Sequence, residues 1–192
     1  MARPGCRAGV QEDVVAMTKP VKEAALDEVL ATALMGDVRF ARWFLSKTPF
    51  GGEDARCVFC RSDHPWSSVT VDVTDSAIGQ SGTVVRECET DVLAVFATPD
   101  GRRLGIHIEN KISGGYFTPL QPELYQARKK QWKHRPKLGD YSEAVAVLVA
   151  PQEFLDRCRE GATMFDARIS HEAIAMALPE FAAALVTAGS TS

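Results

Sequence analysis

No stretch of the sequence is apolar for long enough to span a membrane, and the basic N-terminus lacks the apolar core of a secretion signal. Neither sign of charge dominates, because 22 Lys and Arg residues stand against 25 Asp and Glu, so any surface for a polyanion must be local. Cysteine is scarce and odd in number, with five residues, and does not suggest a disulfide framework. There is no internal repeat, no low-complexity tract and no glycine-rich loop long enough to cradle a phosphate. We therefore expect a cytoplasmic protein whose thiols are reduced.

The length and composition suit one α/β domain. The 192 residues, 45% of them hydrophobic, are enough to bury a core and few for two domains. We expect residues 1–20 to be a disordered lead-in, in which Met17 could be the natural start instead of Met1. Residues 21–187 would form the domain, and residues 188–192 would form a frayed tail.

The hydrophobic pattern predicts a helix, three strands, a helix, a strand and further helices. Helical spacing covers residues 21–34, and Asp37 can cap a second helix through "VRFARWFL". Residues 48–66 contain many turn formers and are expected to be a loop. Strands are predicted over 67–74, 83–97, 104–112 and 144–151, and helices over 121–132, 152–159 and 171–178, the last capped by Ser170 and followed by a break at Pro179. This order favours a mixed sheet flanked by helices.

The segment "LGIHIENKI", Leu104–Ile112, carries an acid and an amine two residues apart. Apolar residues alternate there with Gly105, His107, Glu109 and Lys111, which is the period of a half-buried strand. A Pro-Asp-Gly turn before it is typical of a hairpin, so paired residues should have numbers that sum to about 200.

This register predicts that Asp91 lies opposite Glu109, with Lys111 and Glu89 on the same face. Two opposed carboxylates repel each other, and a divalent cation bound between them would reverse the sign of that interaction. A neighbouring ammonium could then hold the attacking water, which suits hydrolysis of a phosphodiester. The alternative is a solvated sheet edge with no catalytic role.

These residues resemble the PD-(D/E)xK nuclease superfamily. The segments "ETDVLAVF", "LGIHIENKI" and "LQPELYQ" are similar to bacterial members whose catalytic segment is an acid, a hairpin and then Glu-Asn-Lys. Looser matches run from "VRFARWFL" to "VAVLVAP" and "ISHEAIAMAL", so the resemblance covers most of the chain from about Leu26. It implies an α/β fold with a restriction-endonuclease-like αβββαβ core, and a metal-dependent nuclease that hydrolyses DNA.

The resemblance also assigns roles to individual residues. Asp91 and Glu109 would bind Mg²⁺ or Mn²⁺, and the backbone carbonyl of Asn110 would add a metal contact. Lys111 would position the attacking water.

Three further positions are implied near this centre. Gln121 would support the site or touch the phosphate, and Tyr125, one turn on, would line the same groove. Members of the superfamily often recruit another acid from the first helix, for which Glu28 is the positional match.

The segment "ARKKQWKHRPK", Ala127–Lys137, is a candidate nucleic-acid surface. Its basic side chains could contact phosphates while Trp132 stacks on a base. The alternative is a solvated helix face with a packed tryptophan. The basic residues assigned to the interface are Arg128, Lys129, Lys130 and Lys133.

A cysteine pair raises the possibility of zinc. Cys57 and Cys60 have the spacing of half a zinc site, to which His64 and Cys88 could be added, although plain loop thiols are the competing interpretation. The sequence therefore predicts a Mg²⁺- or Mn²⁺-dependent nuclease, with DNA as partner, RNA as an alternative, and a homo-oligomer left open. The competing function is a module on the same fold that binds nucleic acid or a protein partner without cutting, in one version stabilised by zinc.

Overall fold

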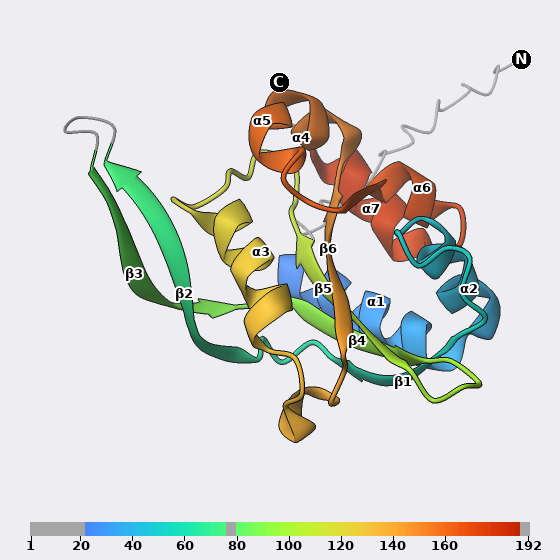
Figure 1. Ribbon diagram of the computed structural model, residues 1–192. Coiled ribbons are helices and arrows are strands. Elements are labelled where there is room, and N and C mark those ends of the chain that lie inside the picture. The colour runs from blue at the N-terminus through green and yellow to red at the C-terminus, as the bar shows by residue number, and fades with distance from the viewer. Residues whose placement is uncertain (1–21, 76–79, 189–192) are drawn as a thin grey trace, which may run out of the picture.

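The computed structural model describes residues 22–75 and 80–188 (Figure 1). The helices are α1 (Glu23–Gly36), α2 (Val38–Ser46), α3 (Gln121–Gln131), α4 (Gln152–Arg157), α5 (Arg159–Ala162), α6 (His171–Ala175) and α7 (Pro179–Ala188), with a 3₁₀ turn, η1, at Pro136–Leu138. The strands are β1 (Arg56–Arg61), β2 (Trp66–Asp75), β3 (Gln80–Glu89), β4 (Val92–Ala97), β5 (Arg103–Asn110), β6 (Glu143–Ala150) and β7 (Ala167–Ser170). The predicted lead-in lies outside the described residues, as does the predicted tail apart from Ala188.

Five strands form one mixed sheet in the order β1-β4-β5-β6-β7. The strands β1, β4 and β5 pair antiparallel, whereas β5, β6 and β7 run parallel to one another. The strands β2 and β3 pair only with each other and form a separate two-stranded ribbon, which extends to one side of the molecule in Figure 1. The expected α/β architecture with a mixed, helix-flanked sheet is confirmed.

The register predicted for the central hairpin is also confirmed. Val92 pairs with Ile108 and Leu93 with His107, so the residue numbers of each pair sum to 200. The turn closes through a backbone hydrogen bond from Gly101 to Thr98, and Gly101 has a φ of 90°, which glycine adopts without strain. Asp91, one residue before β4, is therefore placed opposite Glu109 at the end of β5.

The strands predicted over 67–74, 104–112 and 144–151 are confirmed as β2, β5 and β6, but the rest of the strand prediction was wrong. The expected loop at 48–66 contains β1, and β7 was not predicted at all. The single strand expected over 83–97 is two strands, β3 and β4, because the chain leaves the ribbon at Thr90, whose N–H donates to the carbonyl of Pro65. Pro179 begins α7 instead of only ending a helix, since proline is well suited to the first turn.

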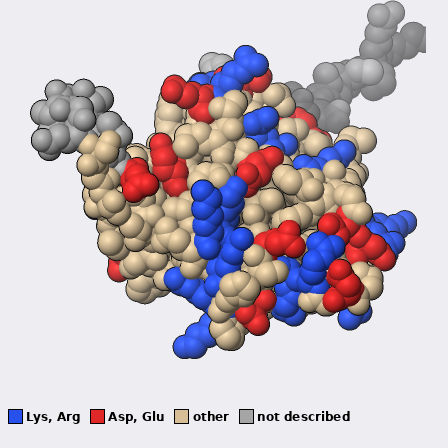
Figure 2. Space-filling model, in the orientation of Figure 1, with Lys and Arg blue, Asp and Glu red and all other residues tan. Residues whose placement is uncertain are grey.

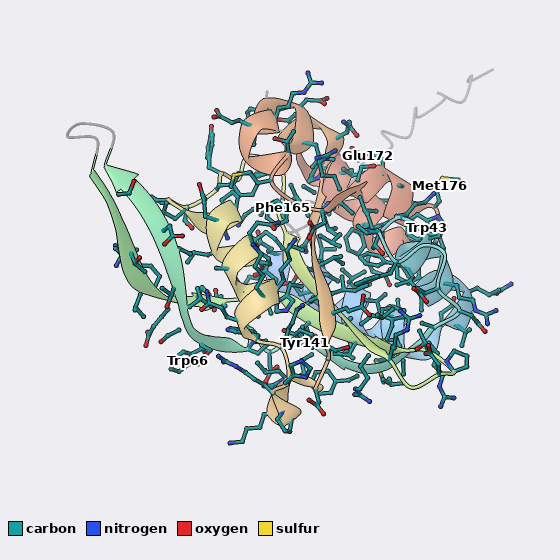
Figure 3. The ribbon with its side chains drawn as sticks, in the orientation of Figure 1. Trp43, Trp66, Tyr141, Phe165, Glu172 and Met176 are labelled. Atoms are coloured by element: carbon teal, nitrogen blue, oxygen red, sulfur yellow. The ribbon has the colours of Figure 1, made fainter. Side chains whose placement is uncertain are left out.

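Helices cover both faces of the sheet. Apolar side chains of α1, α2, α6 and α7 fill one face, and α3, α4 and α5 cover the other (Figure 3). The ribbon packs on α3, where the side-chain amide of Gln131 exchanges hydrogen bonds with the backbone of Thr70 at 2.7 and 2.9 Å. Two predicted caps are confirmed, because Asp37 accepts N–H groups of α2 and Ser170 accepts one of α6. No helix in the described ranges is both long and apolar enough to cross a membrane.

The polar face of β5 is buried, which corrects the half-buried strand expected from its alternation. The ring of Tyr141 lies directly on Gly105, where an added Cβ would come within 2.7 Å of a ring carbon. His107 is fully buried, and its Nε2 lies 2.6 Å from the Tyr141 hydroxyl. The side chains that cover this face of β5 end near its last residues. Glu109 and Lys111 therefore lie where the protein interior meets a cavity.

Candidate active site

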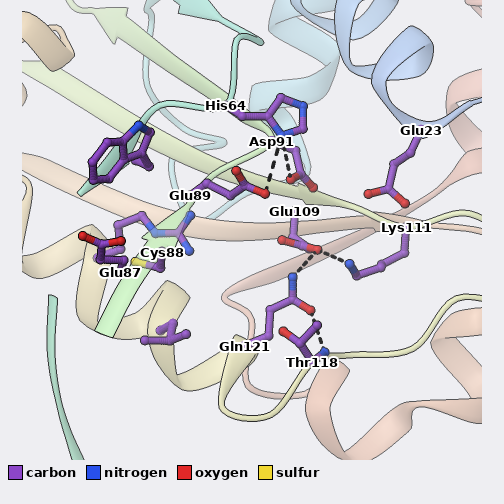
Figure 4. Close-up of a pocket in the computed structure, with 13 residues that line it drawn as sticks. Glu23, His64, Glu87, Cys88, Glu89, Asp91, Glu109, Lys111, Thr118 and Gln121 are labelled. Atoms are coloured by element: carbon purple, nitrogen blue, oxygen red, sulfur yellow. Dashed lines mark hydrogen bonds and ion pairs between the residues drawn. The ribbon is translucent and has the colours of Figure 1, made fainter. Parts of the chain in front are cut away.

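A cavity of about 500 Å³ opens where β5 ends and β4 begins (Figure 4). It is formed by α1, the β1–β2 loop, the base of the ribbon, the β4–β5 hairpin and the start of α3. Its lining residues are Glu23, His64, Trp66, Glu87, Cys88, Glu89, Asp91, Glu109, Lys111, Thr118, Gln121, Leu124 and Arg128. Three of the predicted catalytic residues, Asp91, Glu109 and Lys111, and the predicted Gln121 therefore share one cavity.

Asp91 is held with its carboxylate against the end of β5. Its Oδ2 accepts the backbone N–H of Asn110 at 2.7 Å, and its own N–H donates to the Tyr125 hydroxyl at 3.4 Å. The residue is only 5% exposed. Burial, together with the negative charge of Glu109, raises the pKa of Asp91 to about 9. The surroundings of Asp91 therefore disfavour a negative charge on its carboxyl group.

Glu109 is fixed by two donors. The Nζ of Lys111 lies 2.5 Å from its Oε1, and the side-chain amide of Gln121 donates to the same oxygen at 2.7 Å. Gln121 is itself oriented, since its Oε1 accepts the N–H of Thr118 at 3.0 Å. Leu120, the residue before it, has a φ of 64°, a strained value for a leucine at the start of α3.

Lys111 is almost buried beside three acids. Burial acts to lower the pKa of Lys111, but the nearby charges of Glu109, Glu23 and Asp91 outweigh it, and the pKa is raised. The side chain is therefore an ammonium that contacts the cavity. This is the acid–lysine arrangement that the sequence predicted on one face of the hairpin.

The first helix contributes different acids from the one expected. Glu28 is exposed on α1 and does not line this cavity, so its assignment as a metal ligand was wrong. Glu23 lines the cavity instead, and Asp27 is fully buried behind it. Asp27 accepts the side-chain amide of Asn110 at 2.8 Å, and burial raises its pKa to about 6.

Asn110 ties the hairpin to two helices. Its side-chain amide donates to Asp27 of α1, and its Oδ1 lies 2.9 Å from Nε2 of His171 in α6. Both contacts are buried. Because its N–H also donates to Asp91, Asn110 fixes the position of this carboxylate in the cavity. The role of its backbone carbonyl as a metal ligand stays a prediction.

His64 faces the acids rather than the cysteines. It has a φ of 51°, a conformation that histidine adopts more readily than most residues, and its Nε2 lies 3.4 Å from Asp27. Its Nδ1 lies 3.8 Å from both Glu89 and Asp91. One ligand atom each from His64, Glu89 and Asp91 lie within 4.8 Å of one another, the one such group of three or more in the described residues.

The thiols of Cys57 and Cys60 interact with each other, but the four predicted zinc ligands do not come together. Cys57 and Cys60 lie on β1, where the Cys57 thiol is 3.6 Å from the sulfur of Met35. Cys88 lies on β3 with its thiol 3.6 Å from the Ser67 carbonyl. His64 is committed to the carboxylates. No zinc site forms from these four residues in the described structure.

Much of the predicted nucleic-acid surface on α3 is buried or paired. Arg128 is 1% exposed, and Tyr125 and Trp132 are not exposed at all, so neither ring can stack on a base. Lys129 pairs with Asp166 at 2.5 Å. Lys130 remains exposed and Lys133 half-buried; both belong to the basic segment over which Lys and Arg side chains gather in Figure 2.

The burial of Trp132 leads to a test of the fold. We expect Trp132→Ala to lower the free energy of unfolding by about 3–5 kcal/mol, because a ring packed against Leu93, Val95 and Tyr141 is removed. Urea denaturation measures this loss. Lys130→Ala is the control on the same helix, with an expected change within about 0.5 kcal/mol. An equal, small effect of both substitutions would contradict the packing of Trp132.

A second cavity, of about 760 Å³, adjoins the first and shares His64 and Trp66 with it. Trp66 is 67% exposed at the base of the ribbon. Arg61, Arg135 and Lys137 also line this cavity. Trp66 was not predicted as a site residue, because Trp132 lies inside the basic segment and was the more obvious candidate.

No protein-family model, curated protein or solved structure gives a significant match to the chain. What the cavity does is therefore inferred from its own residues.

Proposed function

We propose that the first cavity is the active site of a metal-dependent nuclease that hydrolyses phosphodiester bonds of DNA. The observation that carries the proposal is the convergence of Asp91, Glu109 and Lys111 in one cavity, with Gln121 bonded to Glu109. These residues and the order helix, three antiparallel strands, helix, strand support membership of the PD-(D/E)xK superfamily and a restriction-endonuclease-like core. In that core β1, β4 and β5 would be the three strands, with the ribbon as an insertion.

The acidic lining fits a divalent cation. Five carboxylates line the cavity, and among the described residues the ion-pair contact of Asp91 is with Nδ1 of His64, at 3.8 Å. Carboxylate oxygens are the ligands that Mg²⁺ and Mn²⁺ prefer. Asp91 would hold the ion either with Glu109, as the sequence predicts, or with His64 and Glu89. When bound, such an ion activates water and neutralises charge on a phosphoryl oxygen.

The chain's own residues would orient the reaction. Lys111, held by Glu109, places an ammonium at the cavity wall, where it can hold the attacking water and stabilise negative charge on the phosphorane. The water oxygen would form a bond to phosphorus and give up a proton to solvent, while the bond to the leaving sugar oxygen breaks and this leaving oxygen takes up a proton. Gln121 keeps the Glu109 carboxylate from rotating.

The second cavity supplies a path for the nucleic-acid strand. Arg135 and Lys137 can contact phosphates there, and Trp66 offers an exposed ring at the boundary between the two cavities. Lys130 adds an exposed charge on α3. This path replaces the one that the sequence placed on Trp132.

The test is incubation with plasmid, linear and single-stranded DNA, and with RNA, in Mg²⁺, Mn²⁺ or EDTA. We expect cleavage of DNA with either metal and none in EDTA. Cleavage in EDTA would contradict the metal requirement, and preference for RNA would change the substrate. Binding without cleavage under every metal would replace the nuclease with a non-cleaving nucleic-acid module.

Three substitutions to glutamine distinguish the metal ligands. If Asp91 and Glu109 hold the ion, Glu109→Gln should lower the cleavage rate about 100-fold or more, and Glu89→Gln less than about threefold. If His64 and Glu89 complete the site, the order reverses, and His64→Gln should act like Glu89→Gln. Cleavage rates at several Mn²⁺ concentrations measure this, since loss of a ligand raises the concentration that is needed.

A further inference from the structure

Arg128 is a buried cation with free donors in the wall of the catalytic cavity. The residue is 1% exposed yet lines the cavity that holds Asp91 and Glu109. Its Nε and Nη1 are buried and have no hydrogen-bond partner. No carboxylate of the described residues lies within 4.0 Å of its guanidinium, although Glu87 and Glu89 line the same cavity.

Packing accounts for the position of Arg128 but not for its charge. Its Cζ lies 3.9 Å from the centre of the Tyr125 ring and 5.4 Å from that of Trp132, so the guanidinium is stacked on a ring face. Such contacts leave the Nε and Nη1 donors without a hydrogen-bond partner, although the guanidinium also interacts with the Tyr125 hydroxyl and the Cys88 thiol. Buried charges in proteins are normally paired, and an unpaired one is costly to the fold. A side chain of this kind is expected where a ligand supplies the missing anion.

We propose that Arg128 binds a phosphate of the substrate strand, next to the phosphate that is cleaved. The inference rests on the proposed function, because it takes the substrate to be a nucleic acid. A guanidinium presents parallel N–H donors that match two oxygens of one phosphate. Arg128 follows Gln121 by seven residues of α3, about 10.5 Å along the helix. The guanidinium lies on the ring of Tyr125, whose hydroxyl is 3.4 Å from the N–H of Asp91, so Arg128 is near the acidic residues but is not paired with them.

The position also explains how an acidic cavity can accept a polyanion. The lining carboxylates repel phosphates, and Lys111 is already paired with Glu109. Arg128 is the arginine that lines this cavity, and its charge is not neutralised by an acid. A phosphate bound there would be screened from water and held by the free N–H groups.

The experiment measures binding of a fluorescent oligonucleotide of about ten thymidines in EDTA, by anisotropy, so that no catalysis is needed. The variants are Arg128→Met, which keeps apolar bulk, Arg128→Lys, which keeps the charge without the fork, and Arg39→Met, an exposed control on α2. We expect about tenfold weaker binding for Arg128→Met, an intermediate loss for Arg128→Lys and less than twofold for Arg39→Met. Thermal melting should show the ligand-free Arg128→Met protein to be at least as stable as the wild type, because an unpaired buried charge is removed.

Three ligand arms identify the source of the phosphate. The oligonucleotide is used with a 5′-hydroxyl and with a 5′-phosphate, and inorganic phosphate is added as a competitor. If substitution of Arg128 weakens binding of both oligonucleotides, Arg128 binds an internal phosphodiester. If it weakens binding of the 5′-phosphate form only, Arg128 binds the end of the strand. If millimolar inorganic phosphate displaced the oligonucleotide, the ligand of Arg128 would be a free phosphate anion. This result would overturn the proposed contact with the nucleic-acid strand.

Other outcomes separate this inference from the proposed function. Unchanged binding by Arg128→Met and Arg128→Lys, or no binding by the wild type, overturns the inference. A lower melting temperature of Arg128→Met with unchanged binding by Arg128→Lys would make the role of Arg128 structural only, and also overturns it. If binding depends on Arg128 but no metal supports cleavage, the phosphate site is upheld and the nuclease function is refuted.

Discussion

Asp91→Asn is expected to lower the rate of metal-dependent cleavage by about a thousandfold or more. The same substitution should stabilise the protein in the absence of metal. The two effects have one cause. Burial and the charge of Glu109 raise the pKa of Asp91 to about 9, so the fold is strained by a carboxyl that a cation would neutralise. Asparagine keeps an oxygen to accept the N–H of Asn110 but carries no charge to bind a metal.

The stability gain should depend on pH. A carboxyl whose pKa is raised on folding contributes stability below about pH 4, and this contribution is lost as the pH rises towards about 9. The wild type should therefore weaken over this range relative to Asp91→Asn, and the difference should reach the order of 2–4 kcal/mol near pH 8. Urea denaturation in EDTA at about pH 5 and pH 8 measures it.

Metal should reverse the order of stability. Saturating Mg²⁺ or Mn²⁺ is expected to stabilise the wild type by about 2–3 kcal/mol at a hundred times its dissociation constant, and to leave Asp91→Asn unchanged. Asp156→Asn, at an exposed position of α4, is the matched control and should behave as the wild type in both tests. An Asp91→Asn protein that is less stable at pH 8 would show that the carboxylate supports the fold, contrary to this account.

The face of the hairpin that carries Asp91, Glu109 and Lys111 could be predicted because its determinants are local. A tight turn fixes which residues face each other, and the alternation of side chains fixes the face on which each one lies. Asp91, Glu109 and Lys111 were placed together from these two rules alone. The register of β4 and β5 needed no information from the rest of the chain.

The acid from α1 could not be predicted in the same way. Asp27 lies on the buried side of the helix, beside Leu26 and Leu30, where an unpaired carboxylate would be unfavourable. What makes it tolerable is the amide of Asn110 and the ring of His64, which come from distant parts of the chain. A pattern read along one helix cannot show these partners, so it favoured the exposed Glu28.

The errors on α3 follow from one missed break in the sheet. Residues 83–97 contain no glycine or proline and were predicted as one strand, although the polar residues Glu89, Thr90 and Asp91 separate a mixed first half from the apolar run at 92–97. Without that break there is no separate ribbon, and without the ribbon nothing covers the outer side of α3. The ring of Trp132, for which both a base-stacking and a packed position were considered, is packed, and Arg128, expected on a basic surface, is buried as well.

Lys111→Met is expected to abolish cleavage as Asp91→Asn does, but to change stability in the opposite direction. Lys111 is the ion-pair partner of Glu109, and both side chains are almost fully buried. Removing the ammonium leaves Glu109 with only the amide of Gln121, so we expect a loss of about 2–4 kcal/mol at neutral pH. The cleavage rate should fall by about 100-fold or more, because the water loses its positioning group.

The double variant Lys111→Met with Glu109→Gln separates the two roles. Replacing both members of a buried pair removes the uncompensated charge, so most of the lost stability should return, and the coupling between the two sites should reach about 1–3 kcal/mol. Cleavage should not return, because both the ammonium and a carboxylate are gone. Lys130→Met, on the exposed side of α3, controls for loss of a positive charge and should change neither quantity. If the double variant were as unstable as Lys111→Met alone, the loss would come from packing of the lysine chain, and the charge of Glu109 would not be what Lys111 balances.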